Sequence, residues 1–108
     1  MTASSSGKNR ISVCDVAARD GLQSEKRIWS VAERVNLINR LANTGIQRIE
    51  AVSFVNPKRV PQMADAEKVM AQIERKVNVR IAGLALNMKG VERALDAGVD
   101  EVRYVVVA

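Results

Sequence analysis

With 108 residues, 47% of them apolar and 27% charged, the chain has room for one modest hydrophobic core and the composition of a soluble globular domain. Its net charge of +5 favours an anionic partner, but scattered Lys and Arg and only three aromatic residues argue against a nucleic-acid site, and nothing indicates a membrane segment. The absence of histidine excludes any mechanism that needs an imidazole within this chain, and a single cysteine excludes a disulfide between its own residues.

The chain starts with a Ser- and Gly-rich stretch, residues 1–10, which predicts a disordered tail. No signal-peptide pattern follows it, so with one cysteine we expect a reduced, cytoplasmic setting. Residues 11–18 form an apolar run that predicts a buried strand. Cys14 lies inside this run, so it is interpreted as a small core side chain.

The first helix is predicted after this strand. Ser30 followed by Glu33 makes a capping box, and Gly45 offers a left-handed stop. Its expected apolar face consists of Val31, Val35, Ile38, Leu41 and Ala42.

Two further helices are predicted over residues 64–76 and 90–97. The second of these is expected to end at Gly98. Their inner faces are expected to hold Val69, Met70 and Ile73 in the first case and Val91, Ala94 and Leu95 in the second.

The remaining β-prone runs are residues 48–54, 79–86 and 101–107. Strands that alternate with helices predict an α/β fold with parallel strands and right-handed crossovers, in a doubly wound sheet or a (β/α) barrel. A closed eight-stranded barrel takes about 250 residues. We therefore interpret residues 11–108 as the first half of a TIM-type barrel, β-α-β-α-β-α-β, whose last strand leaves an edge that needs a continuing chain, a second copy or a docked partner.

Polar side chains follow the predicted strands at their carboxyl ends. Arg19, Asp20 and Gln23 follow the first strand, Ser53 ends the second and Asn87 follows the third. In a parallel sheet these ends meet at one edge, where α/β proteins place their chemistry. A carboxylate suits Mg²⁺ or Mn²⁺, a guanidinium suits a carboxylate or enolate, and the hydroxyl and amide groups can bind substrate.

Asp15 and Glu50 interrupt otherwise apolar strands, where an unpaired charge would be costly. Strand alternation predicts a contact between Asp15 and Arg19 that orients the guanidinium. A buried ion-pair network without catalytic meaning is an equal alternative. The loop 55–65 holds both prolines and the cations Lys58 and Arg59; it suits a phosphate or carboxylate tail, or is a plain connector.

Four sequence blocks together resemble the hydroxymethylglutaryl-CoA lyase family. They are RDGLQSEK at residues 19–26, IEAVSFVNPK at 49–58, VPQMAD at 60–65 and LNMKG at 86–90. The resemblance implies a TIM barrel and the cleavage of 3-hydroxy-3-methylglutaryl-CoA to acetoacetate and acetyl-CoA, with Mg²⁺ or Mn²⁺, in leucine degradation and ketone-body formation.

The resemblance also implies roles for individual residues. Asp20 becomes a metal ligand, and Arg19 stabilises the enolate that forms as the carbon–carbon bond breaks. Gln23, Glu50 and Ser53 belong to the active-site layer. Lys26 lies near the entrance for the CoA chain, and Asp15 stands behind the site, where the family usually has Glu.

Several positions depart from the family pattern. Ala17 and Ala18 stand where Gly-Pro is usual, Arg59 replaces a Trp, and Leu86 replaces a Pro. The family's His-x-His and Asn metal ligands and its loop cysteine come from later strands. We therefore expect this chain alone to be catalytically incompetent.

Two other functions fit the same residues. A related metal-dependent aldolase or acyl-CoA condensing enzyme would share the Asp beside an Arg, and product analysis would separate it from the lyase. A noncatalytic half-barrel that binds an anion or assembles with a partner is the alternative of a different class.

Overall fold

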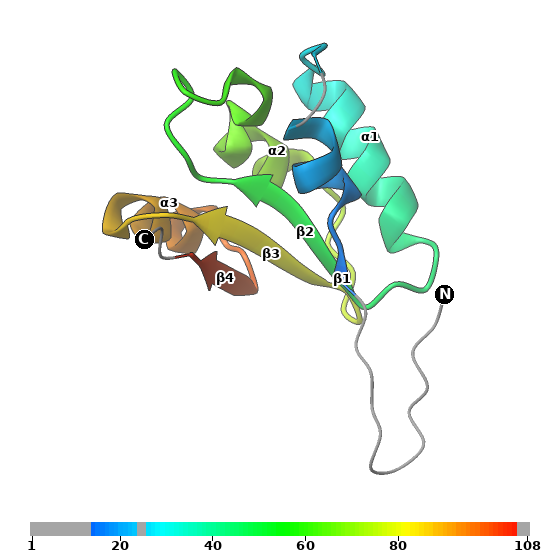
Figure 1. Cartoon of the computed structure of the whole chain (residues 1–108). Helices are drawn as coiled ribbons and strands as arrows, with labels where there is room; N and C mark the ends of the chain where they lie inside the picture. Colours follow the sequence, from blue (N-terminus) through cyan, green and yellow to red (C-terminus); the bar gives the residue numbers. More distant parts are fainter. Residues whose placement is uncertain (1–13, 24–25, 106–108) are drawn as a thin grey trace.

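Four parallel strands lie side by side in the computed structural model, which describes residues 14–23 and 26–105 (Figure 1). They follow the chain in the order β1-β2-β3-β4. The strands span Cys14–Asp15, Arg48–Ser53, Arg80–Ala85 and Glu101–Tyr104. The predicted alternation of parallel strands with helices is confirmed; residues 1–13 and 106–108, which hold the predicted tail and the outer ends of two strands, lie outside the described residues.

The first strand is shorter at its carboxyl end than predicted. It stops at Asp15, and a single turn of π-helix, η1, spans Ala17–Gly21. The N–H groups of Arg19, Asp20 and Gly21 all donate to the carbonyl of Val16, at 2.7 to 3.3 Å. The prediction that the strand reaches residue 18 is therefore wrong, because the backbone groups after Asp15 make their hydrogen bonds within this turn and not with a neighbouring strand.

Helix α1, Val31–Ala42, matches the sequence closely. Ser30 Oγ accepts a hydrogen bond from the Glu33 N–H at 3.1 Å, and Glu33 Oε1 accepts one from the Ser30 N–H at 2.9 Å, which completes the predicted capping box. Gly45 has a φ of 86°, in the left-handed region that favours glycine. The five predicted apolar residues of α1 all pack into the core.

Helix α2 is shorter than predicted. It covers only Ala66–Gln72, after a turn of 3-10 helix, η2, at Pro61–Met63. Asp65 separates the two with a φ of 60°, which an α-helix cannot contain. The three predicted inner residues of α2 are nevertheless buried.

Helix α3 runs from Met88 to Ala97, so it begins two residues before the predicted start, and it ends at Gly98 as predicted. Ala94 is buried and Val91 is half-buried, as expected. Leu95 is 64% exposed, so its placement on the inner face is wrong.

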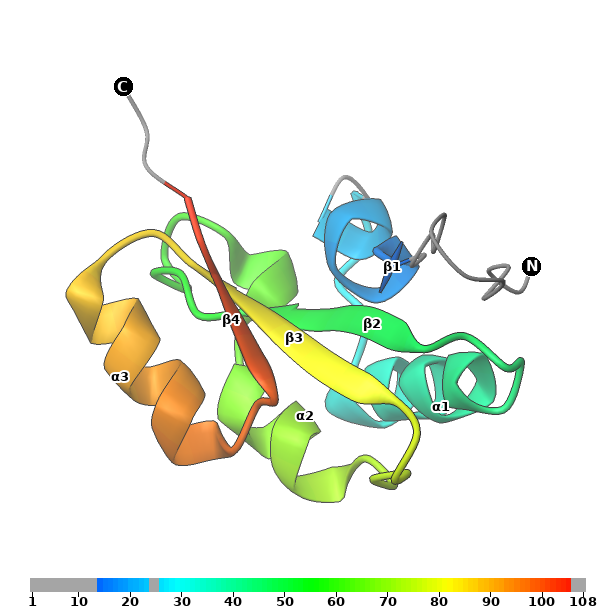
Figure 2. The same ribbon diagram turned by 90° about the horizontal axis from the view of Figure 1, so that it is seen from below.

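The core lies between the sheet and the three helices, which cover one face of it (Figure 2). Ile49, Val52 and Phe54 fill its centre. Gly83 allows the tight fit of Phe54, because a Cβ at this position would lie 2.6 Å from the Phe54 ring. Within residues 14–23 and 26–105 no helix has the length and apolar character to cross a membrane.

Candidate functional site

The most buried ion pair of the described chain joins η1 to β2. Arg19 Nη2 lies 3.1 Å from Glu50 Oε2, and their side chains are only 18% and 4% exposed. The predicted contact between Asp15 and Arg19 is wrong, because Asp15 Oδ1 accepts a hydrogen bond from the Ala17 N–H at 2.8 Å instead. The reason is local: the chain turns after β1, so strand alternation does not extend to Arg19.

Glu50 faces away from the helices. Its neighbour Ile49 packs in the helix-covered core, and alternation directs Glu50 to the opposite face of β2. The turn η1 packs against β2, and in Figure 2 η1 lies above β2 whereas α1 lies below it. The pairing of β2 with β3 shifts register between Glu50 and Val52, an irregularity of the kind that re-aims side chains beside binding sites.

Asp20 stands on the outer side of this pair. Its side chain is 64% exposed, and its Oδ1 lies 3.3 Å from Arg19 Nη1. No group of three or more His, Cys, Asp or Glu side chains that could hold a metal ion occurs in the described part of the chain. Asp20 can therefore supply one carboxylate ligand, but the residues present here do not by themselves fit a metal ion.

Among the residues that the structure describes, three buried polar atoms of the predicted site have no hydrogen-bond partner. They are Arg19 Nε, Gln23 Oε1 and Ser53 Oγ. Leaving such a group buried and unpaired costs about 1–3 kcal/mol, so native proteins rarely keep several together without use. Ser53 ends β2, and Arg19 and Gln23 belong to the turn after β1, so all three lie toward the carboxyl ends of neighbouring strands.

The structure does not bring Asn87 and Lys26 into this group. Asn87 caps α3, where its Oδ1 accepts a hydrogen bond from the Gly90 N–H at 2.8 Å. It lines a separate cavity of about 250 Å³ that also contains Asn56 and Lys89. Lys26 is exposed, and Cys14, predicted to be a core residue, is half-buried.

Two arginines that hold the loop 55–65 were not singled out by the sequence. Arg34 is 2% exposed and donates from Nη1 to the Ala64 carbonyl at 2.6 Å; burial lowers its pKa. Arg93 donates to the Val55 carbonyl at 3.2 Å and to both carboxylate oxygens of Glu67. The position of Arg34 within the apolar stripe of α1 is a sequence signal that its side chain is buried. The sequence contains no comparable signal for Arg93.

Comparison with known proteins adds a family and several relatives. Residues 10–108 match the family model described as HMGL-like. The chain is 45% identical over 93 residues to the 3-hydroxy-3-isohexenylglutaryl-CoA/hydroxymethylglutaryl-CoA lyase of Pseudomonas aeruginosa, and 44% identical over 92 residues to the mitochondrial hydroxymethylglutaryl-CoA lyase of Arabidopsis thaliana. These alignments cover 86% and 85% of this chain.

Solved structures show the same similarity in three dimensions. The HMG-CoA lyase of Brucella melitensis matches with a TM-score of 0.85 at 51% identity, over 87% of this chain and 33% of that one. An HMG-CoA lyase from Acinetobacter baumannii, in complex with coenzyme A and 3-methylmalate, matches with a TM-score of 0.84 at 40% identity, over 86% and 30% of the two chains. The chain thus spans 20% to 31% of the two curated relatives' length.

Proposed function

Because the chain belongs to the HMGL-like family, we propose that it forms the amino-terminal part of the active site of a carbon–carbon lyase that cleaves 3-hydroxy-3-methylglutaryl-CoA to acetoacetate and acetyl-CoA. The observation that carries this proposal is the mostly buried Arg19–Glu50 pair, together with unpaired buried polar atoms of Gln23 and Ser53 in the same two segments of the chain. Each of these residues lies in a block that resembles the lyase family, and together they combine a fixed cation with groups that lack partners.

Arg19 is the residue best placed for the chemistry. In the cleavage, a base takes the proton of the substrate's C3 hydroxyl and the bond between C2 and C3 breaks. C3 becomes the ketone carbon of acetoacetate, and the bonding electrons stay on the thioester fragment as an enolate, which takes up a proton to give acetyl-CoA. Glu50 holds one end of the guanidinium. A cation fixed in this way stabilises the enolate oxygen without reorganising during the reaction, which is the main source of electrostatic catalysis.

The other proposed contacts are with the substrate and a metal ion. Ser53 Oγ and Gln23 Oε1, now without partners, would hydrogen-bond the substrate, and Lys26 and Asn87 would contact the CoA portion from the rim. Asp20 would supply one ligand of a Mg²⁺ or Mn²⁺ ion whose other ligands these residues do not provide. Coenzyme A bound to the Acinetobacter baumannii relative supports an acyl-CoA substrate.

A chimera tests the proposal. This chain replaces the matching third of the Brucella melitensis enzyme, and acetoacetate release from 3-hydroxy-3-methylglutaryl-CoA is measured in the presence of Mg²⁺, beside the 108-residue chain alone. We expect activity from the chimera and none from the chain alone. A folded chimera that releases no acetoacetate from 3-hydroxy-3-methylglutaryl-CoA would contradict the lyase assignment. So would one that instead condenses a 2-oxo acid with acetyl-CoA.

The side chain that the substrate carries at C3 is a second question for the same assay. The Pseudomonas aeruginosa relative is named for both a methyl and an isohexenyl substrate. Assaying the chimera with both thioesters shows which of the two this part of the site accepts. We propose the methyl substrate, because the family resemblance of residues 19–26 and 49–58 is to hydroxymethylglutaryl-CoA lyases.

A further inference from the structure

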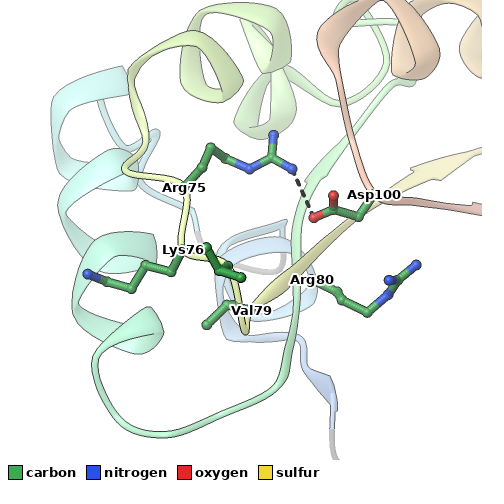
Figure 3. A pocket seen from close by; sticks show the side chains of 6 residues that line it. Arg75, Lys76, Val79, Arg80 and Asp100 are labelled. Carbon is green, nitrogen blue, oxygen red and sulfur yellow. Dashed lines mark hydrogen bonds and ion pairs between the residues drawn. The ribbon is translucent and has the colours of Figure 1, made fainter.

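Two cavities adjoin at the amino ends of β2 and β3. One, of about 300 Å³, is lined by Arg75, Lys76, Val77, Val79, Arg80 and Asp100 (Figure 3). The second, of about 290 Å³, is lined by Gln47, Arg48, Val77, Asn78 and Arg80. Because both contain Val77 and Arg80, they form one continuous surface, which we call the amino-end surface.

Positive charge exceeds negative charge on the amino-end surface. Four cations, Arg48, Arg75, Lys76 and Arg80, stand against two carboxylates, those of Asp100 and Glu101. A single oxygen, Glu101 Oε2, accepts from both Arg80 Nε at 2.6 Å and Arg48 Nε at 3.2 Å. One carboxylate thus balances two guanidinium groups, and these six residues keep a net charge of +2.

The three arginines of this surface are held in place by ion pairs. Arg75 donates to the Gly98 carbonyl and to Asp100 Oδ2, both at 2.8 Å, and Figure 3 shows these two side chains pointing toward each other. Asp100 is fixed in turn by the Ile81 N–H, which donates to the same oxygen at 2.8 Å. Arg80 is bound through its Nε, so its two terminal nitrogens remain for another acceptor.

We propose that the amino-end surface binds a chain of phosphate groups, such as a di- or triphosphate. Consecutive phosphates carry several negative charges within a short length, so one ligand can meet cations in both cavities, and guanidinium forks match phosphate oxygens. No aromatic residue lines either cavity, which disfavours stacking of bases from a nucleic-acid strand.

This site uses other residues than the proposed lyase site. Along β2, Arg48 lies about 7 Å from Glu50 and about 17 Å from Ser53 at the usual rise per residue. Cross-strand pairing places Glu101 in the same row as Glu50, two strands away. Arg75, Lys76 and Arg80 lie on the segment between α2 and β3 or at the first residue of β3. The inference therefore does not depend on the proposed function, and either can fail without the other.

Titration calorimetry of the full chain with sodium tripolyphosphate, at low ionic strength and without divalent cations, tests the proposal. We expect R80Q to weaken binding about tenfold, because it removes a fixed guanidinium. E101Q should strengthen binding severalfold, because it removes the carboxylate that balances two arginines. R27Q removes the same charge from an equally exposed, ion-paired arginine outside both cavities and should change the affinity less than twofold.

The opposite signs keep the test decisive even if one variant folds poorly. Circular dichroism checks that each variant is folded; Arg80 is 55% exposed, so we expect its replacement to be tolerated. A second titration with ATP shows whether the ligand is inorganic polyphosphate or a nucleotide. If ATP and tripolyphosphate bind with equal affinity, the surface recognises the phosphate chain alone. If ATP binds more tightly and its binding still depends on Arg80, the nucleoside also contacts the surface. No binding, weaker binding by E101Q, or an equal loss in R27Q and R80Q would overturn the proposal.

Discussion

Two charged clusters on the sheet use their residues in different ways. Between η1 and β2, Arg19 pairs with the buried Glu50 and also contacts Asp20 on its outer side, and buried polar atoms of Gln23 and Ser53 lack partners. In the other cluster, Glu101 is shared between Arg48 and Arg80, which are more exposed. Burial of the first cluster carries a desolvation cost, but it also strengthens the electrostatic interaction of these groups with a ligand. In the second cluster, water screens the charges and weakens their interactions.

This difference shows which polar groups call for a functional explanation. An exposed ion pair can be present for solubility or a small gain in stability, so its geometry alone says little. Buried groups such as Ser53 Oγ, which lack a partner, reduce stability and so indicate a ligand. The amino-end surface is of interest for its excess of charge and its cavities, not for its individual ion pairs.

Replacing Glu50 is expected to have the largest effect on stability. E50A leaves the mostly buried guanidinium of Arg19 without its main partner and should lower the free energy of unfolding by about 3 kcal/mol. Urea unfolding followed by circular dichroism measures this loss. The double variant R19M/E50L should recover most of it, and a double variant as unstable as E50A would show that the charge pair is not the cause.

Adding a methyl group at Gly83 tests how tightly the core packs against the sheet. G83A places a Cβ 2.6 Å from Phe54 Cε2, so the ring must move, and we expect a loss of about 2 kcal/mol in the same unfolding experiment. G21A is the matched control, because its Cβ would meet no atom closer than 3.9 Å. Equal effects of the two substitutions would contradict the packing described here.

Ser30 is a polar residue with an ordinary structural role, against which the buried groups can be compared. S30A removes the Oγ that accepts from the Glu33 N–H and should cost about 1 kcal/mol in thermal or urea unfolding. S30T, which keeps a capping hydroxyl, should cost clearly less. A loss as large as that of E50A would mean that exposed and buried polar groups contribute alike, against our comparison.

The smallest expected effect concerns pH at the amino end. The hydrogen bond from Arg80, with the charges of Arg48 and Arg103, lowers the pKa of Glu101. Since the pKa is lower in the folded state, the stabilisation is present above the unfolded value of about 4.3 and disappears as pH falls through the folded value. The stability difference between wild type and E101Q should be under about 1 kcal/mol at pH 7 and shrink toward pH 3. A difference that grows on acidification would refute this sign.

Local sequence signals located most of the fold. The Ser30–Glu33 capping box and the stripe from Val31 to Ala42 describe interactions within one helix, so the start of α1 could be predicted to the residue, whereas its last residue, Ala42, precedes the predicted stop at Gly45. The π-helical turn after β1 could not, because its closure on the Val16 carbonyl and its packing on β2 arise only in three dimensions. Leu95 was misplaced because periodicity gives a face but not how far the sheet extends beneath it.

The sequence singled out residues for the candidate site, whose roles stay predictions, but it did not give their contacts. Charges within apolar strands marked Glu50 as needing a partner, yet that partner is Arg19, 31 positions earlier in the sequence. Asn87 was grouped with the site because it follows a neighbouring strand, but the structure uses its side chain to cap α3. Sequence order indicates which end of a sheet a residue occupies, not which neighbour it binds.

The most direct test of our central claim compares R19Q and R80Q in the Brucella melitensis chimera. Each removes one guanidinium, that of the mostly buried Arg19 or that of the exposed Arg80. We expect R19Q to lower kcat for 3-hydroxy-3-methylglutaryl-CoA cleavage at least about 100-fold, as the loss of a transition-state charge contact does, and R80Q to leave kcat within about twofold. Similar kcat values for the two variants would contradict the assignment of Arg19 as the catalytic cation.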